Sequence, residues 1–184
     1  MHHGSGTTLQ SIIDAINDKK LDAKINLVVS DNPNAYALVR ARNSGIDTYL
    51  ISSKSKEEID IELDNLLEKY DVNLIVLAGY LRLIGERLIS KYKIINTHPS
   101  LLPKFGGKGM YGMKVHTAVW ENKEKFTGPT IHFVNNEYDK GNIITQTMVE
   151  VKETDTPEVI SSKVQAIEKI QLIETLKRFV NGEL

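Results

Sequence analysis

The sequence predicts an α/β protein in which helices flank a mainly parallel β-sheet. Three observations carry this prediction. Helical and strand patterns alternate along the whole chain, which is typical of parallel strands joined by crossover helices. The segment Asn73–Leu77 is almost wholly apolar, as expected of a strand covered on both faces. A length of 184 residues, 41% of them hydrophobic and 26% charged, suits a single domain over residues 1–184.

The elements of the first half follow from apolar spacing and from turn signals. Leu9, Ile12, Ile13 and Ile16 recur at helical spacing, so a helix follows the small residues Gly4–Thr8. The next expected elements are a strand over 25–30 that ends at Asp31-Asn32-Pro33, a helix over 35–44 that ends at Gly45, a strand over 48–51, and a helix whose apolar stripe runs from Ile59 to Tyr70.

The second half is interpreted in the same way. After the strand at 73–77 we expect a short strand over 93–96, a long irregular segment over 99–112 that is rich in Gly and Pro, a helix over 113–122, strands over 130–134 and 143–149, and a final helix over 157–180. The final helix should turn Val164, Ile167, Ile170, Ile173 and Leu176 toward the core. Ligands of such sheets usually bind beyond the carboxyl ends of the strands.

Composition excludes several classes of protein. The chain has 23 Lys and Arg against 24 Asp and Glu, so general binding of nucleic acid is not expected. It has no cysteine, which excludes disulfides, thiolate nucleophiles and Cys-ligated metal centres. No stretch reaches the roughly 20 apolar residues of a membrane span, and the first residues lack the apolar core of a signal peptide. We expect a cytoplasmic protein without a membrane partner.

The first segment that could carry chemistry is Gly4-Ser5-Gly6-Thr7-Thr8, ahead of the first helix. Small residues let backbone amides approach an anion, and the N-terminus of a helix adds free N–H donors and positive potential. A phosphate would suit this place. The same residues are equally compatible with a plain Ser/Thr helix cap.

A second candidate is Asn96-Thr97-His98-Pro99, directly after a strand. An Asn amide can donate to a developing oxyanion without titrating. His98, two residues on, points to the same side if the chain is still extended, and an imidazole can move a proton near neutral pH. Taken alone, this pattern also fits a histidine that only hydrogen-bonds the turn.

The third candidate is the polar loop after the strand at 130–134, which contains Asp139. A carboxylate near His98 would favour the imidazolium form and so raise its pKa. The alternative is a solvated surface turn. His132 lies within the strand and is interpreted as structural. A metal site built from His98, His116 and His132 lacks ligand spacing, so no metal is expected.

Taken in order, these segments resemble one family. The Gly-Ser-Gly-Thr-Thr-Leu-Gln opening, Leu77-Ala78-Gly79-Tyr80-Leu81-Arg82-Leu83-Ile84, the Asn96–Pro103 segment and the His132–Gly141 segment are similar to those of the phosphoribosylglycinamide formyltransferases. The resemblance covers essentially the whole chain. Asn-x-His-Pro-Ser-Leu-Leu-Pro marks the wider group of folate-dependent formyltransferases, and the glycine loop and the final helix indicate the glycinamide ribonucleotide family within it.

The resemblance implies the doubly wound formyltransferase fold and a reaction of de novo purine synthesis. A formyl group would pass from 10-formyltetrahydrofolate, a co-substrate, to the glycinamide amine, with no metal and no covalent intermediate. Asn96, His98 and Asp139 match the catalytic trio of the family. Asn96 and protonated His98 would donate hydrogen bonds to the developing oxyanion, and Asp139 would hold His98 and raise its pKa.

The resemblance also implies two groups of substrate-binding residues, with either a monomer or a homodimer as the assembly. Lys56 matches a position that is often arginine in the family, and it would meet the glutamate tail of the folate. The ribonucleotide would contact Gly6, Thr7, Thr8, Leu9, Gln10, Gln165 and Glu168. The folate would contact Lys56, Leu81, Arg82, Leu83, Ile84, Asn96, Asn135, Asn136, Glu137, Tyr138 and Asp139.

The sequence departs from the family in two places. The family's usual buried strand before the glycine loop has no counterpart in Met1-His2-His3, so we expect a sheet without that strand and with exposed neighbouring edges. The Lys104–Gly112 loop is longer and richer in glycine than in many relatives. It is interpreted as a mobile flap beside the site, although an inert loop fits its composition equally well.

Two alternative functions remain open. A formyltetrahydrofolate deformylase would deliver the formyl group to water, but that family adds an N-terminal regulatory domain. Methionyl-tRNA and sugar-nucleotide formyltransferases are not favoured, because they usually add a C-terminal domain that we do not expect here. A non-catalytic nucleotide-binding module would keep the scaffold, yet it would have no need of Asn96, His98 and Asp139 together.

Overall fold

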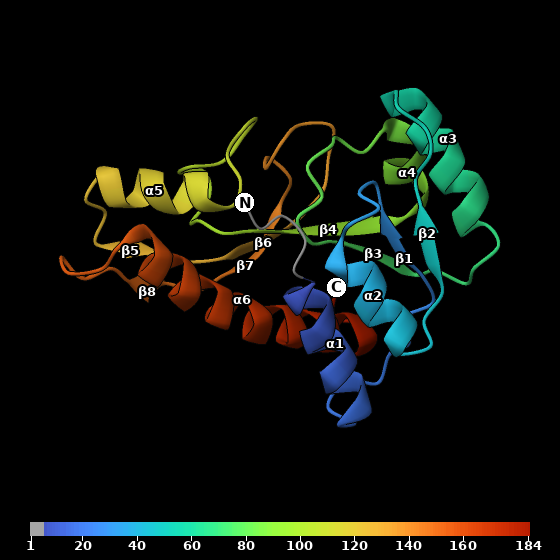
Figure 1. Cartoon of the computed structure of the whole chain (residues 1–184), viewed down its shortest axis with the longest axis horizontal. Helices are drawn as coiled ribbons and strands as arrows, with labels where there is room; N and C mark the ends of the chain where they lie inside the picture. The colour runs from blue at the N-terminus through green and yellow to red at the C-terminus, as the bar shows by residue number, and fades with distance from the viewer. Residues whose placement is uncertain (1–5) are drawn as a thin grey trace.

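A computed structural model describes residues 6–184 and contains helices on both faces of a central sheet (Figure 1). The longest helix, α6, runs beneath the sheet, while α3, α4 and α5 lie on the opposite side. The elements are α1 Thr7–Asn17, β1 Val28–Ser30, α2 Tyr36–Asn43, β2 Thr48–Leu50, α3 Lys56–Leu67, β3 Leu74–Leu77, α4 Glu86–Lys91, β4 Lys93–His98, α5 Met113–Glu121, β5 Phe126–Thr127, β6 Thr130–Phe133, β7 Ile143–Gln146, β8 Val149–Glu150 and α6 Pro157–Val180.

The strands form two parallel pairs followed by antiparallel additions. β1 pairs with β2 in parallel, and β3 pairs with β4 in parallel. β4 then continues into antiparallel β6 and β7, which gives the order β3-β4-β6-β7. A small antiparallel pair, β5 with β8, lies apart. The α/β prediction with parallel strands in the central layer is confirmed, and the strands after β4 are the antiparallel part.

The sheet is interrupted between β1 and β3. Within residues 6–184 no strand pairs with the free edge of either one. Side chains nevertheless pack across the gap: Leu27 and Val29 meet the same apolar cluster as Ile75 and Leu77. β3 is half-buried along its length, whereas the sequence predicts a strand covered on both faces. The edge of β3 that faces β1 is unpaired in the described chain, which explains why β3 is less buried than predicted.

Two apolar clusters join the helices to the sheet. One packs α3 and α4 against β4 through Ile59, Leu63, Leu88 and Ile94. The other packs α6 against the opposite face, where Leu172 contacts the cluster of Ile95 and Ile131. β4 therefore has buried side chains on both faces, which makes it the strand best fixed in position.

Two helices, α6 and α3, begin at well-defined caps. Thr156 accepts a hydrogen bond from the Val159 N–H at the start of α6, and Pro157 takes the first helical position. Ser55 and Glu58 form a complete capping box at the start of α3. The predicted bounds of the final helix are confirmed, but Ile170 is 63% exposed, so its assignment to the core side is wrong.

Several short elements differ from the sequence prediction. α4 has six residues and was not expected. The strand predicted over 143–149 is two strands, β7 and β8, because the chain turns away at Thr147 to pair with β5. The turn requires Gly128, whose φ is 148° and where a Cβ would lie 1.8 Å from the Thr147 carbonyl oxygen.

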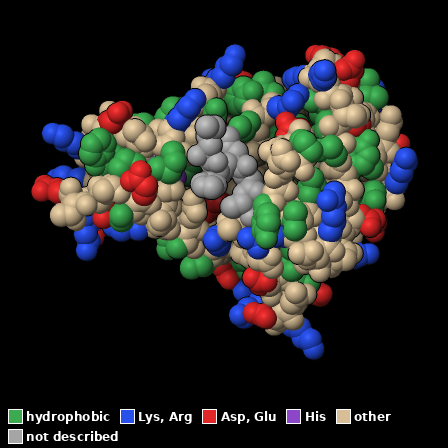
Figure 2. Space-filling view, in the orientation of Figure 1, with side chains coloured by type: hydrophobic (Ala, Val, Ile, Leu, Met, Phe, Trp, Pro, Cys, Tyr) green, Lys and Arg blue, Asp and Glu red, His purple; other side chains and the backbone are tan. Residues whose placement is uncertain are grey.

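The surface mixes charges of both signs. On the face drawn in Figure 2, Lys and Arg side chains alternate with Asp and Glu around the rim, in agreement with the net charge of -1. No helix within the described part of the chain is long and apolar enough to cross a bilayer.

Candidate active site

Asn96 and His98 lie at the carboxyl end of β4. The strand extends to His98, so the two side chains alternate to one face, as predicted. On one side β3 pairs with it, Leu77 opposite Asn96. On the other side β6 pairs with it, His132 opposite Asn96 and Thr130 opposite His98. Because strands flank β4 on both sides, the backbone positions of Asn96 and His98 are fixed by the ladder.

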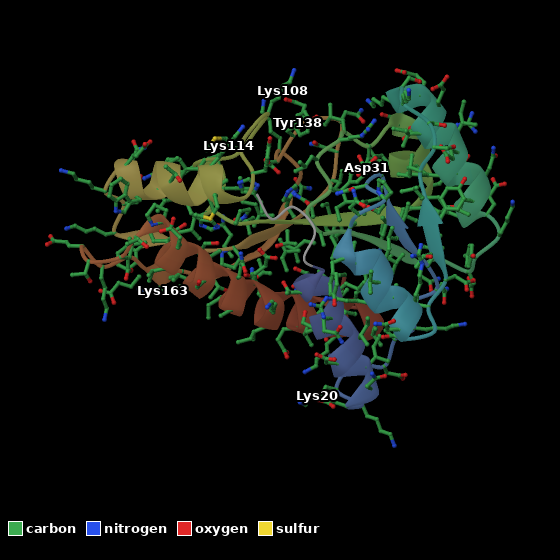
Figure 3. The ribbon with its side chains drawn as sticks, in the orientation of Figure 1. Lys20, Asp31, Lys108, Lys114, Tyr138 and Lys163 are labelled. Carbon is green, nitrogen blue, oxygen red and sulfur yellow. The ribbon has the colours of Figure 1, made fainter. Side chains whose placement is uncertain are left out.

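Asp139 reaches the same point from the loop between β6 and β7. Its Oδ2 lies 3.4 Å from His98 Nδ1, and its Oδ1 accepts from Asn96 Nδ2 at 3.4 Å. Oδ2 also accepts from the backbone N–H of Gly107 at 2.9 Å, so the glycine-rich loop docks on this carboxylate. In Figure 3 Lys108 and Tyr138, the neighbours of these two residues, lie close together. The structure brings the predicted trio into contact.

The His98 ring has a defined orientation. Only 4% of His98 is exposed, and Nε2 lies 2.8 Å from the carbonyl oxygen of Phe105. A carbonyl only accepts, so Nε2 carries a proton. In the neutral ring Nδ1 is then the free acceptor, and it faces Asp139. Phe105 holds its carbonyl there with a φ of 53°, a left-handed conformation that a β-branched residue would resist.

Burial lowers the pKa of His98, and the charge of Asp139 and the Phe105 carbonyl only partly oppose it. From the sequence, Asp139 is expected to raise the pKa of His98. The Asp139 carboxylate does raise the pKa of His98, but desolvation of the ring lowers it by more, so the net shift is downward. The lowered pKa favours the neutral imidazole near pH 7.

Asp139 remains ionised despite its burial. Burial raises its pKa, but the neighbouring His132 ring, the charge of His98 and the Gly107 N–H together lower it below the ordinary value. Its φ of 56° is also left-handed, a conformation that Asp and Asn adopt more readily than most residues.

His132 is a site residue that the sequence analysis interprets as merely structural. Its Nδ1 lies 2.8 Å from the Phe133 carbonyl oxygen, so Nδ1 holds the proton and Nε2 accepts from Asn96 Nδ2 at 3.1 Å. This contact fixes which end of the Asn96 amide donates. The signal lay in the register of β4 and β6, which a single sequence does not display. Gly141 makes room, since a Cβ there would lie 1.6 Å from the Phe133 oxygen.

The turn after His98 is braced by buried hydroxyls. Thr130 Oγ1 donates to the Ser100 carbonyl at 2.6 Å and accepts from the Leu102 N–H at 3.1 Å. Ser100 Oγ donates to the Lys104 carbonyl at 2.6 Å. The peptide bond between Leu102 and Pro103 is cis. These contacts lead the chain back so that the Phe105 carbonyl meets the His98 ring.

The predicted ribonucleotide residues come from α1 and α6, and some of them meet. Gly6 caps α1 with a φ of 66°, which suits a turn that approaches a ligand closely; Gly4 and Ser5 lie outside the described residues. Burial raises the pKa of Glu168, and Thr97 and Thr8, which adjoin its carboxyl, partly oppose this shift. Thr97 stands between Asn96 and His98, so this group adjoins the catalytic strand.

The other predicted ribonucleotide residues are engaged differently. Gln165 is exposed, and its amide donates to Ser161 at 3.1 Å. The Gln10 side chain is engaged within the protein, because it donates to Asp14 at 2.8 Å and accepts from Arg40 at 2.9 Å. Thr7 and Leu9 are both half-buried within the first turns of the helix.

The predicted folate residues line two loops. Arg82 is tied across the gap in the sheet, because Nε donates to Asp31 at 2.8 Å and Nη1 donates to the Lys54 carbonyl at 3.0 Å. Figure 3 places Asp31 at the end of β1. Ile84 is 4% exposed and belongs to the core, so its side chain is not available to a ligand. Leu81 is 41% exposed, and Leu83 is half-buried.

The second folate loop is the one that ends at Asp139. Asn135 Oδ1 accepts from the Glu137 N–H at 2.9 Å, and Asn136 reaches Glu86 of α4. Glu137 pairs with Lys140 at 2.7 Å, and Tyr138 is half-buried. Lys56 is exposed at the first position of α3. No group of three or more His, Asp or Glu within residues 6–184 has the arrangement of a metal site.

Comparison with known proteins places this geometry in context. The formyl transferase family matches residues 1–176. The phosphoribosylglycinamide formyltransferase of Escherichia coli is 36% identical over 98% of this chain and 85% of its own length. The chloroplastic enzyme of Arabidopsis thaliana is 40% identical over 88% of this chain, which spans 57% of that relative. Glycinamide ribonucleotide transformylase 1 of Symbiobacterium toebii superposes with a TM-score of 0.89 at 35% identity, over 98% of this chain and 85% of that one.

Proposed function

This chain belongs to the formyl transferase family, and we propose that it transfers the formyl group of 10-formyltetrahydrofolate to the amine of 5'-phosphoribosylglycinamide. The products would be formylglycinamide ribonucleotide and tetrahydrofolate, in purine biosynthesis. The observation that carries the proposal is the meeting of Asn96, His98 and Asp139 within 3.4 Å at the end of β4. The names of the bacterial and plant relatives support the substrate pair.

Asn96 stabilises the oxygen of the formyl group. The amine nitrogen attacks the formyl carbon, and negative charge grows on the oxygen as a tetrahedral intermediate forms. One amide hydrogen of Asn96 is held by His132 at 3.1 Å, and the other has only a long 3.4 Å contact with Asp139. That second hydrogen is the one offered to the oxyanion, and a donor of this kind is worth about 10²–10³ in rate.

His98 carries the proton through Nδ1. The attacking amine must lose a proton, and the folate nitrogen must gain one as the bond from the formyl carbon to it breaks. With Nε2 committed to the Phe105 carbonyl, the neutral ring accepts at Nδ1 and then donates from the same atom. The lowered pKa of His98 suits a group that starts neutral and is protonated only in passing.

Asp139 stabilises the imidazolium while it exists. Its carboxylate faces Nδ1 at 3.4 Å and stays ionised because its own pKa is lowered. The Gly107 N–H donates to Oδ2, the same oxygen that faces the ring, so the carboxylate is held in position against His98. No metal takes part in this scheme.

The substrates bind on opposite sides of the trio. The phosphate lies at Gly6-Thr7-Thr8, where the first turn of α1 offers backbone N–H groups. Glu168 pairs with the glycinamide or ribose end and recovers its ionised form there, since a nearby ammonium lowers a carboxyl pKa. The folate lies along Leu81–Leu83 and the Asn135–Asp139 loop, with Lys56 toward its glutamate tail.

A spectrophotometric assay of the 184-residue chain with 10-formyltetrahydrofolate tests the proposal. Tetrahydrofolate should form only when glycinamide ribonucleotide is also present, and the His98→Ala variant serves as the blank for spontaneous hydrolysis. Folate product without the ribonucleotide would indicate a deformylase. No product under either condition would refute the transferase.

A further inference from the structure

Arg40 of α2 reaches the first turn of α1, where neither the motifs nor the resemblance assign it a role. Its Nη1 donates to Gln10 Oε1 at 2.9 Å, and its guanidinium carbon lies 4.9 Å from the centre of the Tyr36 ring. The side chain is half-buried between the two helices. Arg40 thus touches the same helical turn that the ribonucleotide phosphate is proposed to occupy.

The turn at Gly6 rests directly on α2. A Cβ at Gly6 would lie 2.8 Å from Ala37 Cα and 3.1 Å from Arg40 Cδ, so the backbone of Gly6 packs on the aliphatic part of the Arg40 side chain. The Gly6 carbonyl accepts from the Gln10 N–H at 2.9 Å. Gly6 and Gln10 are therefore joined by the backbone, and Arg40 contacts both of them.

The start of α1 has no side-chain cap, so its first turn depends on the contacts made by Arg40. Gly6 has no side chain to cap α1, and the first turn contains no acidic residue. The N–H groups at the start of the helix are thus not consumed by a side chain of their own cap. The Arg40 guanidinium, which is bonded to Gln10 of this turn, adds positive charge near it. Its planar fork faces Gln10 while its flat side lies over the Tyr36 ring, a combination that the single ammonium group of a lysine does not reproduce.

We propose that Arg40 is a positioning residue for the phosphate-bearing substrate. It holds the Gly6–Gln10 turn against α2 and adds fixed positive charge next to the anion, while the chemistry remains with Asn96, His98 and Asp139. This inference rests on the proposed function for the identity of the substrate. The anion site that it supports can also be tested with inorganic phosphate alone.

The first test separates binding from turnover in Arg40→Gln and Arg40→Lys. Arg40→Gln should raise the KM for glycinamide ribonucleotide about 10-fold, with kcat and the KM for formyl folate changed less than about 2-fold. Arg40→Lys should fall between, because it keeps the charge and loses the fork. The control is Arg42→Gln, which removes the same charge from the same helix at an exposed side chain bonded to Thr48. Equal effects of Arg40→Gln and Arg42→Gln, or a loss confined to kcat, would overturn the proposal.

The second test needs no turnover. Inorganic phosphate should raise the melting temperature of the native chain and of Arg42→Gln, and much less that of Arg40→Gln. If phosphate gives these shifts but the native chain shows no formyl transfer, the proposed function is refuted and the role of Arg40 at the anion site is retained. An equal rise in all three proteins, or no rise in the native chain, would overturn that role. Circular dichroism of Arg40→Lys and Arg40→Gln before addition verifies that both are folded.

Discussion

The residue that separates this site from an ordinary polar cluster is His98, because a single ring bridges a backbone carbonyl and a carboxylate. We expect His98→Ala to reduce formyl transfer at least ~100-fold, since the proton carrier is lost, while ribonucleotide binding measured by calorimetry is largely retained. His98→Gln is the matched variant: it keeps an N–H for the Phe105 carbonyl but takes up no proton. Restored turnover in that variant would mean that the ring only supports the loop.

Asp139 allows a second residue-scale prediction, because Asn tolerates its left-handed φ. The carboxylate raises the pKa of His98 against the larger effect of burial, so Asp139→Asn should lower that pKa further. In the proposed mechanism the neutral ring is the active form, so activity should fall as the pH drops through the pKa of His98. The acidic limb of the kcat/KM profile should therefore move to lower pH. A reduced rate with an unmoved limb would show that Asp139 acts by position alone.

At the scale of elements, the start of α3 can be tested without touching the chemistry. Ser55 accepts from the Glu58 N–H, and Glu58 accepts from the Ser55 N–H. Ser55→Ala removes the first of these bonds and should cost about 1 kcal/mol of unfolding free energy, which is about 2–4 °C in Tm for a chain of this size. The turnover number should not change. Ser44→Ala, at an exposed cap residue of α2, is the control, and an equal loss there would contradict the capping argument.

Helices and strands were predicted correctly where the apolar pattern was long, and were missed where strand pairing determined the element or where the element was very short. The 24 residues of α6 carry a cap, a proline and a sustained apolar spacing, and their bounds follow from the sequence. β5 has two residues and exists because β8 lies beside it. The six residues of α4 show less than two helical turns of periodicity, so no local signal separates them from a loop.

The residues of the candidate site also fall into those that local patterns predict and those that depend on tertiary structure. Asn96, His98 and Asp139 were predicted from their place after strands and from a family pattern, and the structure brings them together. His132 and the Phe105 carbonyl were not predicted, because one depends on the register of β6 against β4 and the other on a left-handed backbone. The sign of the His98 pKa shift also depends on burial, which the sequence does not quantify.

At the scale of the whole molecule, His116, a buried histidine outside the proposed trio, is expected to make stability depend on pH. Burial, with a smaller effect of His98, lowers the pKa of His116 to about 4, and His116 is 2% exposed. The unfolded chain has the ordinary pKa of about 6.5. Between these values the unfolded state binds more protons, so stability is complete above pH 6.5 and is lost as the pH falls toward 4.

We therefore expect His116 to remove about 3 kcal/mol of unfolding free energy between pH 7 and pH 4. Urea titrations at the two pH values measure it, with His116→Leu as the comparison. On acidification from pH 7 to pH 4, His116→Leu should lose about 3 kcal/mol less unfolding free energy than the native chain. The carboxylates that also titrate in this range are common to both proteins, so their contribution cancels. The same loss in both would place the acid sensitivity elsewhere.

The interruption between β1 and β3 has a consequence for how the protein unfolds. A continuous ladder makes each strand's opening depend on its neighbours. Within residues 6–184 no backbone ladder joins β1 to β3; the two portions are joined by side-chain packing and by side-chain hydrogen bonds, such as those of Arg82 to Asp31 and Lys54 and of Asn26 to the Asp71 carbonyl. The β1–β2 portion can then open at a lower free energy than the portion built on β4. Arg82 lies in the segment proposed to contact the folate, so under that proposal a bound folate opposes the partial opening, and the cooperativity of unfolding rises with folate concentration.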